Sequence, residues 1–374
     1  MNAIIKWWMT PKLPPEDIFD FPLLQNKSIF GKGFHLISHW LIHPFKRRLA
    51  RRYLKLLQSY TKITVIGVTG SAGKSTTVQM IASILRQKGK TVATPPSIDP
   101  IFNVPNTILK CPPWTKFLIL EMSVEYPGEM DFYLWLAKPD IGVITNIFPT
   151  HTEFLKDEEG VLKEKSKLTI SLDESSFAVL NQDDKRLRNL ARKIRARIIW
   201  FKADNAAAAS SVGKLLGVSG DGISYGLKNY NRPKHRLEIK KHKSGAVILD
   251  DSYNSNPEAA ILTVNYFNQL AKGEKIAVLG EMLELGGYEE EGHRKLGEVV
   301  AKSNFAVVIG VGEASKYLID EINKNNQAIK TYLVSAEDEV FPILEPLISK
   351  KTYILIKGSR SIGLDKLVSR LSGY

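Results

Sequence analysis

The stretch Ile63-Thr-Val-Ile-Gly-Val-Thr-Gly-Ser-Ala-Gly-Lys-Ser-Thr-Thr77 decides the fold that we expect for this chain. Its β-branched start, Ile63 to Ile66, is typical of a buried strand, and the helical pattern Val78 to Leu85 follows a glycine-rich turn. Glycines let the backbone curl so that several N–H groups and the helix N-terminus face one anion. We therefore interpret the turn as a phosphate-binding loop for the triphosphate of a nucleotide.

Within this loop, Lys74 adds a mobile cation, and the hydroxyl of Ser75 suits a Mg²⁺ ligand. A glycine turn that binds nothing is the plainer interpretation, but Lys-Ser-Thr-Thr follows at the place that phosphate binding requires. The residues that we expect to contact the nucleotide here are Gly70, Ser71, Ala72, Gly73, Lys74, Ser75 and Thr76.

Length and cysteine content limit the architecture and the setting. The chain has 374 residues, which is enough for two or three domains, because single cores stop growing at about 250 to 300 residues. A single cysteine, Cys111, excludes an internal disulfide framework and a multi-cysteine zinc site. We expect a reducing, cytoplasmic setting.

Residues 1–60 form a basic, amphipathic N-terminal segment with ten Lys or Arg against three acids, in a chain whose formal net charge is +13. From Phe34 to Leu57, apolar residues recur every four positions among many cations, as in an amphipathic helix. One interpretation of residues 34–57 is a helix on an anionic membrane surface, at the inner face of a membrane, and the other is a helix packed on the ATPase domain. We do not expect nucleic acid as the partner. The apolar row is Ile37, Leu41, Phe45, Leu49, Tyr53 and Leu57, with Trp7, Trp8 and Trp40 nearby in sequence.

Beyond Lys62, strand and helix patterns alternate, which predicts an α/β fold. We expect a P-loop ATPase domain with a parallel sheet over residues 61–232. A Rossmann-like α/β domain, also with a parallel sheet, should follow over residues 233–374. The hinge between the two domains is expected at Lys228–Arg236. The expected strands are Ile63–Ile66, Phe117–Leu120, Ile141–Thr145, Ala178–Leu180 and Ile198–Phe201, then Ala246–Leu249, Ile276–Leu279, Ala306–Ile309, Thr331–Val334 and Tyr353–Ile356. The expected helices of the second domain are Pro257–Leu270, Glu289–Ser303, Ala314–Asn325, Glu337–Ile348 and Leu364–Leu371.

An acid and a histidine follow two of the expected strands. Glu121 ends the strand that begins at Phe117, and His151 stands six residues after Thr145. Both belong at the carboxyl edge of the sheet, where ligands bind in open α/β folds. A carboxylate and an imidazole beside a phosphate loop make a second Mg²⁺ site, although each alone is equally an ordinary surface residue.

The loop form Gly-x-Thr-Gly-x-x-Gly-Lys-Ser, at Gly67–Ser75, resembles that of the Mur ligase family of ATP-dependent amide-bond-forming enzymes. Further blocks are similar to the family, and to its dipeptide-adding branch, in the same order along about residues 62 to 370. They are Leu120–Met122, Pro127–Glu129, Lys138–Ile147, His151–Glu153, Gly160–Lys165, Asp250–Pro257, Leu279–Gly286, Glu291–Arg294 and Lys357–Arg360.

The resemblance implies a role for individual residues. Lys74 and Ser75 would hold the ATP phosphates and a first Mg²⁺, and Glu121 and His151 a second. Lys165 falls where the family has a lysine carbamylated by CO₂ as a further metal ligand, and the alternative is a solvated lysine. The implied nucleotide contacts are Asn205 to adenine, Arg236 to the phosphates, Asp251 to the ribose and Asn254 nearby. Arg236 has an interdomain salt bridge as its alternative role. Substrate contacts would fall at His293, Arg294 and Lys357–Arg360.

What the resemblance implies is an ADP-forming ligase with ATP and two Mg²⁺ ions, which joins an acid to an amino acid through an acyl phosphate. The product would be a cell-wall precursor, made by adding an amino acid or a dipeptide such as D-Ala-D-Ala to a muramyl-peptide-like carboxylate. The acceptor would be a small-molecule or lipid-linked peptide precursor. Two alternatives stay open: a poly-γ-glutamate or folylpolyglutamate-type ligase, and a non-catalytic, membrane-associated ATP-binding module.

Two features depart from the family pattern. Only about 60 residues precede the loop, and they are basic and aromatic, so we do not expect the usual N-terminal uridine-binding domain. In addition, Ser123–Tyr126 stands where the dipeptide ligases show Gly-Ala-Asn-His, and Phe102–Thr107 only partly follows their Ile-Gly-x-Pro-x-Thr block. A different amine substrate is therefore a further alternative.

Overall fold

The computed structural model describes residues 41–96, 100–202 and 204–373. The chain divides into two compact units: unit 1 comprises Met1–Ile147 and Glu158–Pro233, and unit 2 comprises Phe148–Asp157 and Lys234–Tyr374. The segment Phe148–Asp157 therefore groups with unit 2, whereas the sequence interpretation placed it in the ATP-binding domain. Among the described residues, no helix combines the length and the apolar content that a membrane crossing requires.

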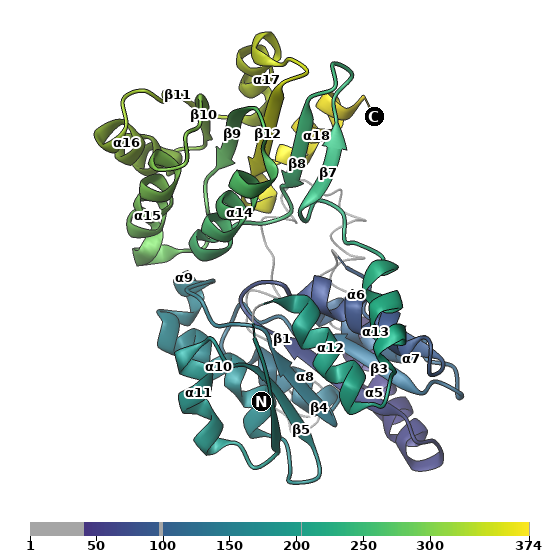
Figure 1. The fold of residues 1–374 in the computed structure, drawn as a ribbon. Coiled ribbons are helices and arrows are strands. Elements are labelled where there is room, and N and C mark those ends of the chain that lie inside the picture. The colour runs from purple at the N-terminus through teal and green to yellow at the C-terminus, as the bar shows by residue number, and fades with distance from the viewer. Residues whose placement is uncertain (1–40, 97–99, 203, 374) are drawn as a thin grey trace. The chain divides into compact units, whose positions relative to one another are not determined.

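Unit 1 contains a six-stranded parallel sheet, as the sequence predicts (Figure 1). Its strands lie in the order β2-β3-β1-β4-β5-β6, so that β1 is central and pairs with both β3 and β4. The short strand β2 was not predicted. The strands are β1 (Thr64–Thr69), β2 (Thr91–Ala93), β3 (Phe117–Glu121), β4 (Ile141–Ile144), β5 (Phe177–Asn181) and β6 (Arg197–Phe201).

Helices cover both faces of this sheet, because alternate residues of the buried strands point to opposite faces. One apolar core joins Leu118 of β3 to residues of α5 (His43–Tyr60), α7 (Pro100–Leu109), α8 (Glu129–Leu136) and α10 (Glu158–Ile170). The other joins Ile119 to residues of α6 (Lys74–Leu85), α12 (Asn205–Leu215) and α13 (Gly220–Lys228). The short helix α11 (Lys185–Leu190) lies between β5 and β6 in sequence.

Unit 2 contains a second six-stranded sheet, in the order β11-β10-β9-β12-β8-β7. The prediction of a wholly parallel sheet is wrong at one edge, because β7 pairs antiparallel with β8. β7 has one apolar residue among three charged ones, and none of the four is buried, so it lacks the pattern of a core strand and was not predicted. The strands are β7 (Glu238–Lys241), β8 (Val247–Asp251), β9 (Glu274–Gly280), β10 (Val307–Val311), β11 (Lys330–Val334) and β12 (Thr352–Lys357).

The helices of unit 2 follow the predictions with one exception. The helix expected over Glu337–Ile348 is broken into the short α17 (Val340–Leu344) and flanking 3-10 turns, because Pro342 and Pro346 remove backbone donors. The other predicted helices are α14 (Pro257–Leu270), α15 (Glu289–Ala301), α16 (Ser315–Asn325) and α18 (Leu364–Ser372), and the short helix α9 (Thr152–Leu155) was not predicted.

The apolar row predicted for residues 34–57 does not form a single buried face of helix α5. Residues 34–40, which include Trp40, lie outside the described part of the chain, as do Trp7 and Trp8. Residues four apart are rotated by about 40° in an α-helix, so a row with this spacing winds around the helix. Leu57 is buried, but Phe45 and Leu49 are exposed. The buried face is instead formed by Ala50, Leu54 and Leu57, which pack in the core of unit 1. Packing on the ATPase domain is thus confirmed for one face of the helix.

Candidate active site

The predicted phosphate-binding loop is the turn between β1 and α6. Gly70 has a φ of 146° and Gly73 a φ of 80°, which are backbone conformations that favour glycine. A Cβ at Gly70 would collide with the hydroxyl of Thr145, and a Cβ at Gly73 with the carboxamide of Asn205. Both glycines are therefore required by conformation and by space.

Two residues that follow β4 hold the loop in place. The N–H of Ala72 donates to Oδ1 of Asn146 at 2.8 Å, and the N–H of Ser71 donates to the carbonyl oxygen of Asn146 at 3.1 Å. The hydroxyl of Thr145 donates to the carbonyl oxygen of Ala72 at 2.6 Å. Sequence analysis missed Thr145 and Asn146 as loop supports, although their place directly after the strand next to β1 is a usable signal. The loop is preorganised by these bonds.

The first turn of α6 meets the end of β3. The hydroxyl of Ser75 donates to Oε1 of Glu121 at 3.0 Å, and both side chains are buried. The N–H of Glu121 in turn donates to the hydroxyl of Thr94 at 2.9 Å, a support that the sequence did not reveal. Nζ of Lys74 donates to the carbonyl oxygen of Gly70 at 2.9 Å, across the mouth of the loop. The structure thus brings together a hydroxyl and a carboxylate, which are the oxygen ligands that Mg²⁺ prefers.

Lys165, on α10, is not one of the solvated lysines of its segment. Its side chain is 0% exposed, and Nζ lies 3.4 Å from the carbonyl oxygen of Val124. Burial lowers the pKa of Lys165 well below its usual value, and the charge of Lys74 lowers it further. Three carboxylates oppose this shift: Glu129, Glu125 and Glu164. Burial therefore makes the charged form of this lysine less favourable than it is in water, and the neutral amine is the nucleophilic form.

Asn205 is the first residue of α12, and its carboxamide is the group that a side chain at Gly73 would meet. Asp204 caps this helix by accepting from the N–H of Ala207 at 2.9 Å. Unit 1 therefore brings together Gly70–Thr76, Glu121 and Asn205 and places Lys165 within electrostatic range of Lys74.

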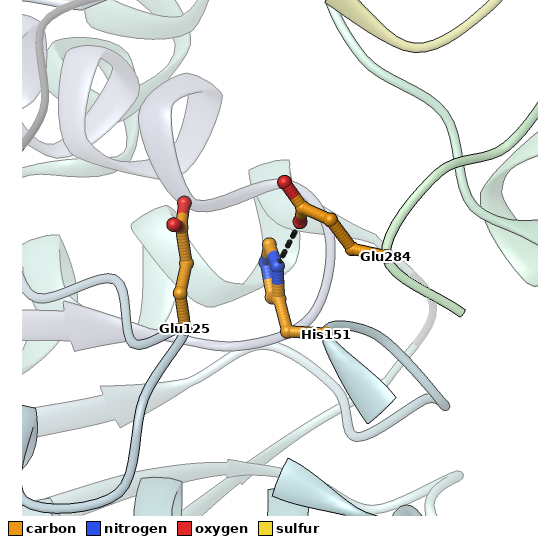
Figure 2. A group of neighbouring side chains, drawn as sticks. All are labelled: Glu125, His151 and Glu284. Atoms are coloured by element: carbon orange, nitrogen blue, oxygen red, sulfur yellow. Dashed lines mark hydrogen bonds and ion pairs between the residues drawn. The ribbon is translucent and has the colours of Figure 1, made fainter. Parts of the chain in front are cut away.

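His151 belongs to unit 2, so its predicted place beside Glu121 and Lys165 stays a prediction. Its Nδ1 lies 2.5 Å from Oε2 of Glu284, a partner that the sequence did not suggest (Figure 2). This hydrogen bond lowers the pKa of Glu284. Both residues have a positive φ, 55° for His151 and 63° for Glu284. Strained backbone of this kind is common at functional sites.

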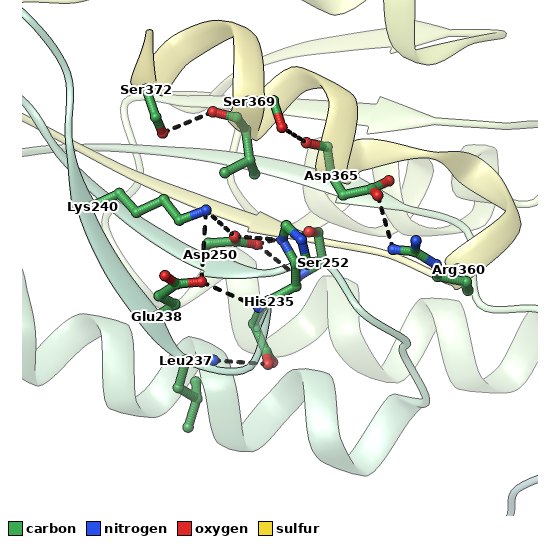
Figure 3. A network of polar contacts seen from close by, with 12 residues as sticks. His235, Leu237, Glu238, Lys240, Asp250, Ser252, Arg360, Asp365, Ser369 and Ser372 are labelled. Carbon is green, nitrogen blue, oxygen red and sulfur yellow. Dashed lines mark hydrogen bonds and ion pairs between the residues drawn. The ribbon is translucent and has the colours of Figure 1, made fainter. Parts of the chain in front are cut away.

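Arg236 lies between two residues with a positive φ, His235 at 58° and Leu237 at 51°. This segment is tied to the end of β8, because His235 contacts Asp250 at 2.8 Å and the N–H of Leu237 donates to Asp251 at 3.2 Å (Figure 3). The guanidinium of Arg236 lies 4.2 Å from the centroid of the ring of Tyr253, and its Nε is buried with no hydrogen-bond partner among the described residues. An arginine held in this way is suited to binding an anion.

The same network resembles a metal site but is filled by a lysine. His235, Glu238 and Asp250 present ligand atoms within 4.8 Å of one another. Lys240 pairs with both carboxylates, at 3.6 Å from Glu238 and 3.2 Å from Asp250 (Figure 3). The ammonium group thus supplies the positive charge that these acids require.

Asp251, the predicted ribose ligand, is already bound by its own chain. Its Oδ2 accepts from Nζ of the buried Lys357 at 2.6 Å and from the hydroxyl of Thr263 at 2.8 Å. Nζ of Lys357 also donates to the carbonyl oxygen of Asn254 at 3.1 Å, and Asn254 itself is exposed. Lys357 therefore ties together two of the predicted nucleotide contacts. The buried His293 accepts from the N–H of Met282 at 3.0 Å, which gives it a structural role.

Comparisons with known proteins cover nearly the whole described chain. Residues 68–261 match the model of the Mur ligase middle domain, and residues 235–360 match that of the Mur ligase, glutamate ligase domain. The UDP-N-acetylmuramoyl-tripeptide--D-alanyl-D-alanine ligase of Buchnera aphidicola subsp. Baizongia pistaciae is 26% identical over an alignment of 401 positions, gaps included, that covers 96% of this chain and 82% of that relative.

Two solved structures share the fold. MurF from Acinetobacter baumannii has a TM-score of 0.80 and 23% identity, with 89% of this chain and 81% of that chain covered. The MurF ligase from Thermotoga maritima in complex with ADP has a TM-score of 0.77 and 24% identity, with 88% and 83% covered. The α/β architecture of both units is therefore one that ligases of this kind use.

Proposed function

Because the chain belongs to the Mur ligase family, we propose that it is an ATP-dependent, ADP-forming ligase whose nucleotide phosphates bind at the loop Gly70–Thr76. The single observation that best supports this is the buried contact of 3.0 Å between Ser75 and Glu121 beside the preorganised loop. A phosphate loop alone occurs in many ATPases, but the carboxylate of Glu121 at this place adds the second ligand type that a metal-nucleotide complex needs.

The reaction has two steps. An oxygen of the substrate carboxylate attacks the γ-phosphorus of ATP, the bond to the bridging oxygen breaks, and ADP leaves with that electron pair. The acyl phosphate then reacts with a neutral amine, which forms the C–N bond, expels phosphate and loses a proton to solvent. In the first step the loop N–H groups and Lys74 reduce the repulsion between the carboxylate and the γ-phosphate.

One Mg²⁺ ion fits the donor set of unit 1, a hydroxyl beside a carboxylate. Ser75 and Glu121 would hold Mg²⁺, and Glu121, His151 and a carbamylated Lys165 are proposed for a second ion. When bound, the ions would neutralise phosphate charge.

Carbamylation of Lys165 is supported by its burial. Burial lowers the pKa of Lys165 and so favours the loss of its proton, and the neutral amine attacks CO₂ to form an N–C bond and release one proton. The product is an anion whose oxygens resemble a carboxylate. It would remove the cost of burying a cation next to Lys74 and supply a metal ligand instead.

We expect the acceptor carboxylate to be that of a muramyl tripeptide and the amine substrate to be D-alanyl-D-alanine, because the similar ligases bear these substrates in their names. A nucleotide-linked acceptor is the first candidate, and a lipid-linked one the second. The proposed nucleotide contacts are Asn205, Arg236, Asp251 and Asn254. The role of Arg236 is supported by its buried Nε, which has no hydrogen-bond partner among the described residues. Attachment to a membrane is a separate proposal, because it depends on the surface of α5.

A substrate matrix tests the function. The full chain is incubated with ATP and Mg²⁺, with nucleotide-linked muramyl tripeptide, lipid-linked muramyl tripeptide or, to test the polyglutamate alternative, a folate as acceptor, and with D-alanyl-D-alanine or L-glutamate as amine. Ligation product is scored by mass and ADP by a coupled assay. The proposal requires ADP and product only when an acceptor and D-alanyl-D-alanine are both present. Product with L-glutamate and a folate acceptor would point to the polyglutamate alternative, and nucleotide binding without turnover to the non-catalytic module.

Carbamylation has its own readout. Protein equilibrated with ¹³C-bicarbonate should show a carbamate carbon signal by NMR that Lys165→Arg lacks. Lys163→Arg, at an exposed position of the same helix, is the matched control and should keep the signal. A signal that survives in Lys165→Arg would exclude this lysine as the modified residue.

A further inference from the structure

Helix α5 has a second apolar face that the core of unit 1 does not cover. Phe45, Leu49 and Leu56 are 59%, 45% and 52% exposed. At about 100° per residue these side chains fall within one narrow sector, which is separate from the sector of Ala50, Leu54 and Leu57. Tyr60, 83% exposed, extends the same face toward the end of the helix. We refer to Phe45, Leu49, Leu56 and Tyr60 as the outer face of α5.

The outer face cannot turn inward, because the buried face of the same helix is anchored in the core. Leu54 and Leu57 are buried in the core cluster that includes residues of α7 and α8. Two arginines add contacts to α8: the guanidinium of Arg47 lies 5.1 Å from the ring centroid of Phe132, and that of Arg51 lies 4.7 Å from that of Trp135. The orientation of the helix on unit 1 is thus set by packing on one side only.

Cations border and interrupt the outer face. Arg52 and Lys55 are exposed, and Lys46 is half-buried on the other border. The helix from His43 to Tyr60 contains no Asp or Glu. A narrow apolar strip among cations, on a helix without acids, combines an affinity for hydrocarbon with an affinity for negative charge.

We propose that the outer face of α5 binds the surface of an anionic lipid bilayer. Phe45, Leu49 and Leu56 enter the boundary between head groups and acyl chains, while Lys46, Arg52 and Lys55 contact lipid phosphates. A bilayer satisfies both requirements at once, because its apolar layer lies directly beneath a layer of negative charge. A protein partner would have to place acids around an apolar groove of matching length. The inference does not depend on the ligase reaction.

The test is co-sedimentation of the full chain with vesicles of phosphatidylcholine, with and without phosphatidylglycerol. Binding is expected only with the anionic lipid. Two triple variants separate the two contributions: Phe45→Ser with Leu49→Ser and Leu56→Ser, and Lys46→Glu with Arg52→Glu and Lys55→Glu. Arg47 and Arg51 are left unchanged, because they pack on α8.

The apolar variant should bind the anionic vesicles at least about tenfold more weakly than the wild type. The charge variant should bind them at least about 100-fold more weakly. Matched controls carry the same kinds of change on exposed positions elsewhere: Leu262→Ser with Tyr266→Ser on α14, and Arg192→Glu with Lys193→Glu. Both controls should bind like the wild type. Thermal unfolding checks that every variant is folded.

Several outcomes would overturn the proposal. The first is a wild-type chain that does not bind the anionic vesicles, and the second is an equal loss of binding in the control variants. The third is weaker binding by the charge variant while the apolar variant binds normally, which would indicate charge attraction without insertion. Light scattering of the wild type and the apolar variant adds one more: a dimer that becomes a monomer in the variant would show that a second copy of the chain covers this face.

Discussion

The hydroxyl of Ser75 lies 3.0 Å from Oε1 of Glu121, although 46 positions separate the two residues in the chain. Parallel pairing of β1 with β3 sets Val68 opposite Glu121 and so delivers the carboxylate to the loop. A buried hydroxyl donating to a buried carboxylate is a stable arrangement without metal, and the same two oxygens are suited to a shared cation.

Glu121→Gln should raise the Mg²⁺ concentration for half-maximal ligase activity by about tenfold or more, because the amide can still accept from Ser75 but brings no charge to the metal. The measurement is a Mg²⁺ titration at saturating ATP. Glu174→Gln, at an exposed position of the same unit, is the control and should leave the titration unchanged. An unshifted titration in Glu121→Gln would remove Glu121 from the metal site.

Gly70→Ala should weaken ADP binding by at least about tenfold and lower the free energy of unfolding of unit 1 by roughly 1–3 kcal/mol, because a Cβ at φ 146° meets the hydroxyl of Thr145. Calorimetric titration with ADP measures the first effect, and denaturant unfolding the second. Gly287→Ala is the matched control, since its Cβ would find no atom within 4 Å. Equal behaviour of the two variants would contradict the strain argument.

Lys165→Met should raise the unfolding temperature by roughly 2–4 °C near neutral pH in CO₂-free buffer, while abolishing carbamylation. The pKa of Lys165 in the folded chain lies well below 10.5, the usual pKa of a lysine. Between the folded and the unfolded pKa, the unfolded chain binds more protons, so the stability of the wild type rises with pH in that range. The advantage of the methionine variant should therefore shrink as the pH rises toward 10.5. A gain that is independent of pH would mean that burial does not lower the pKa of Lys165.

Lys357→Met should lower the free energy of unfolding of unit 2 by roughly 3 kcal/mol, because it leaves the carboxylate of Asp251 without its cation at 2.6 Å. The double variant Asp251→Asn with Lys357→Met should recover most of this loss. Denaturant unfolding followed by a probe in unit 2 gives both values. If the double variant were as unstable as the single one, packing of Lys357 and not its charge would be the stabilising factor.

Local patterns identified most of the architecture and part of the site. Glycine spacing and the Lys-Ser pair located the loop, and the position of Glu121 at the end of an apolar strand placed its carboxylate at the correct edge of the sheet. Where local patterns were weak, the prediction failed: β7, at a sheet edge, has a single apolar residue among three charged ones, and two prolines break the helix expected over Glu337–Ile348.

The order of residues along the chain determined the strands, the phosphate loop and the family, because strand burial, glycine conformation and motif spacing are properties of short segments. Only the tertiary structure decided which distant groups meet: Asn146 with the loop, Glu284 with His151, and Lys357 with Asp251. It also divided the apolar residues of α5 between a buried and an exposed face. These outcomes depend on strand order and on which helix packs against which, and no short segment encodes that information.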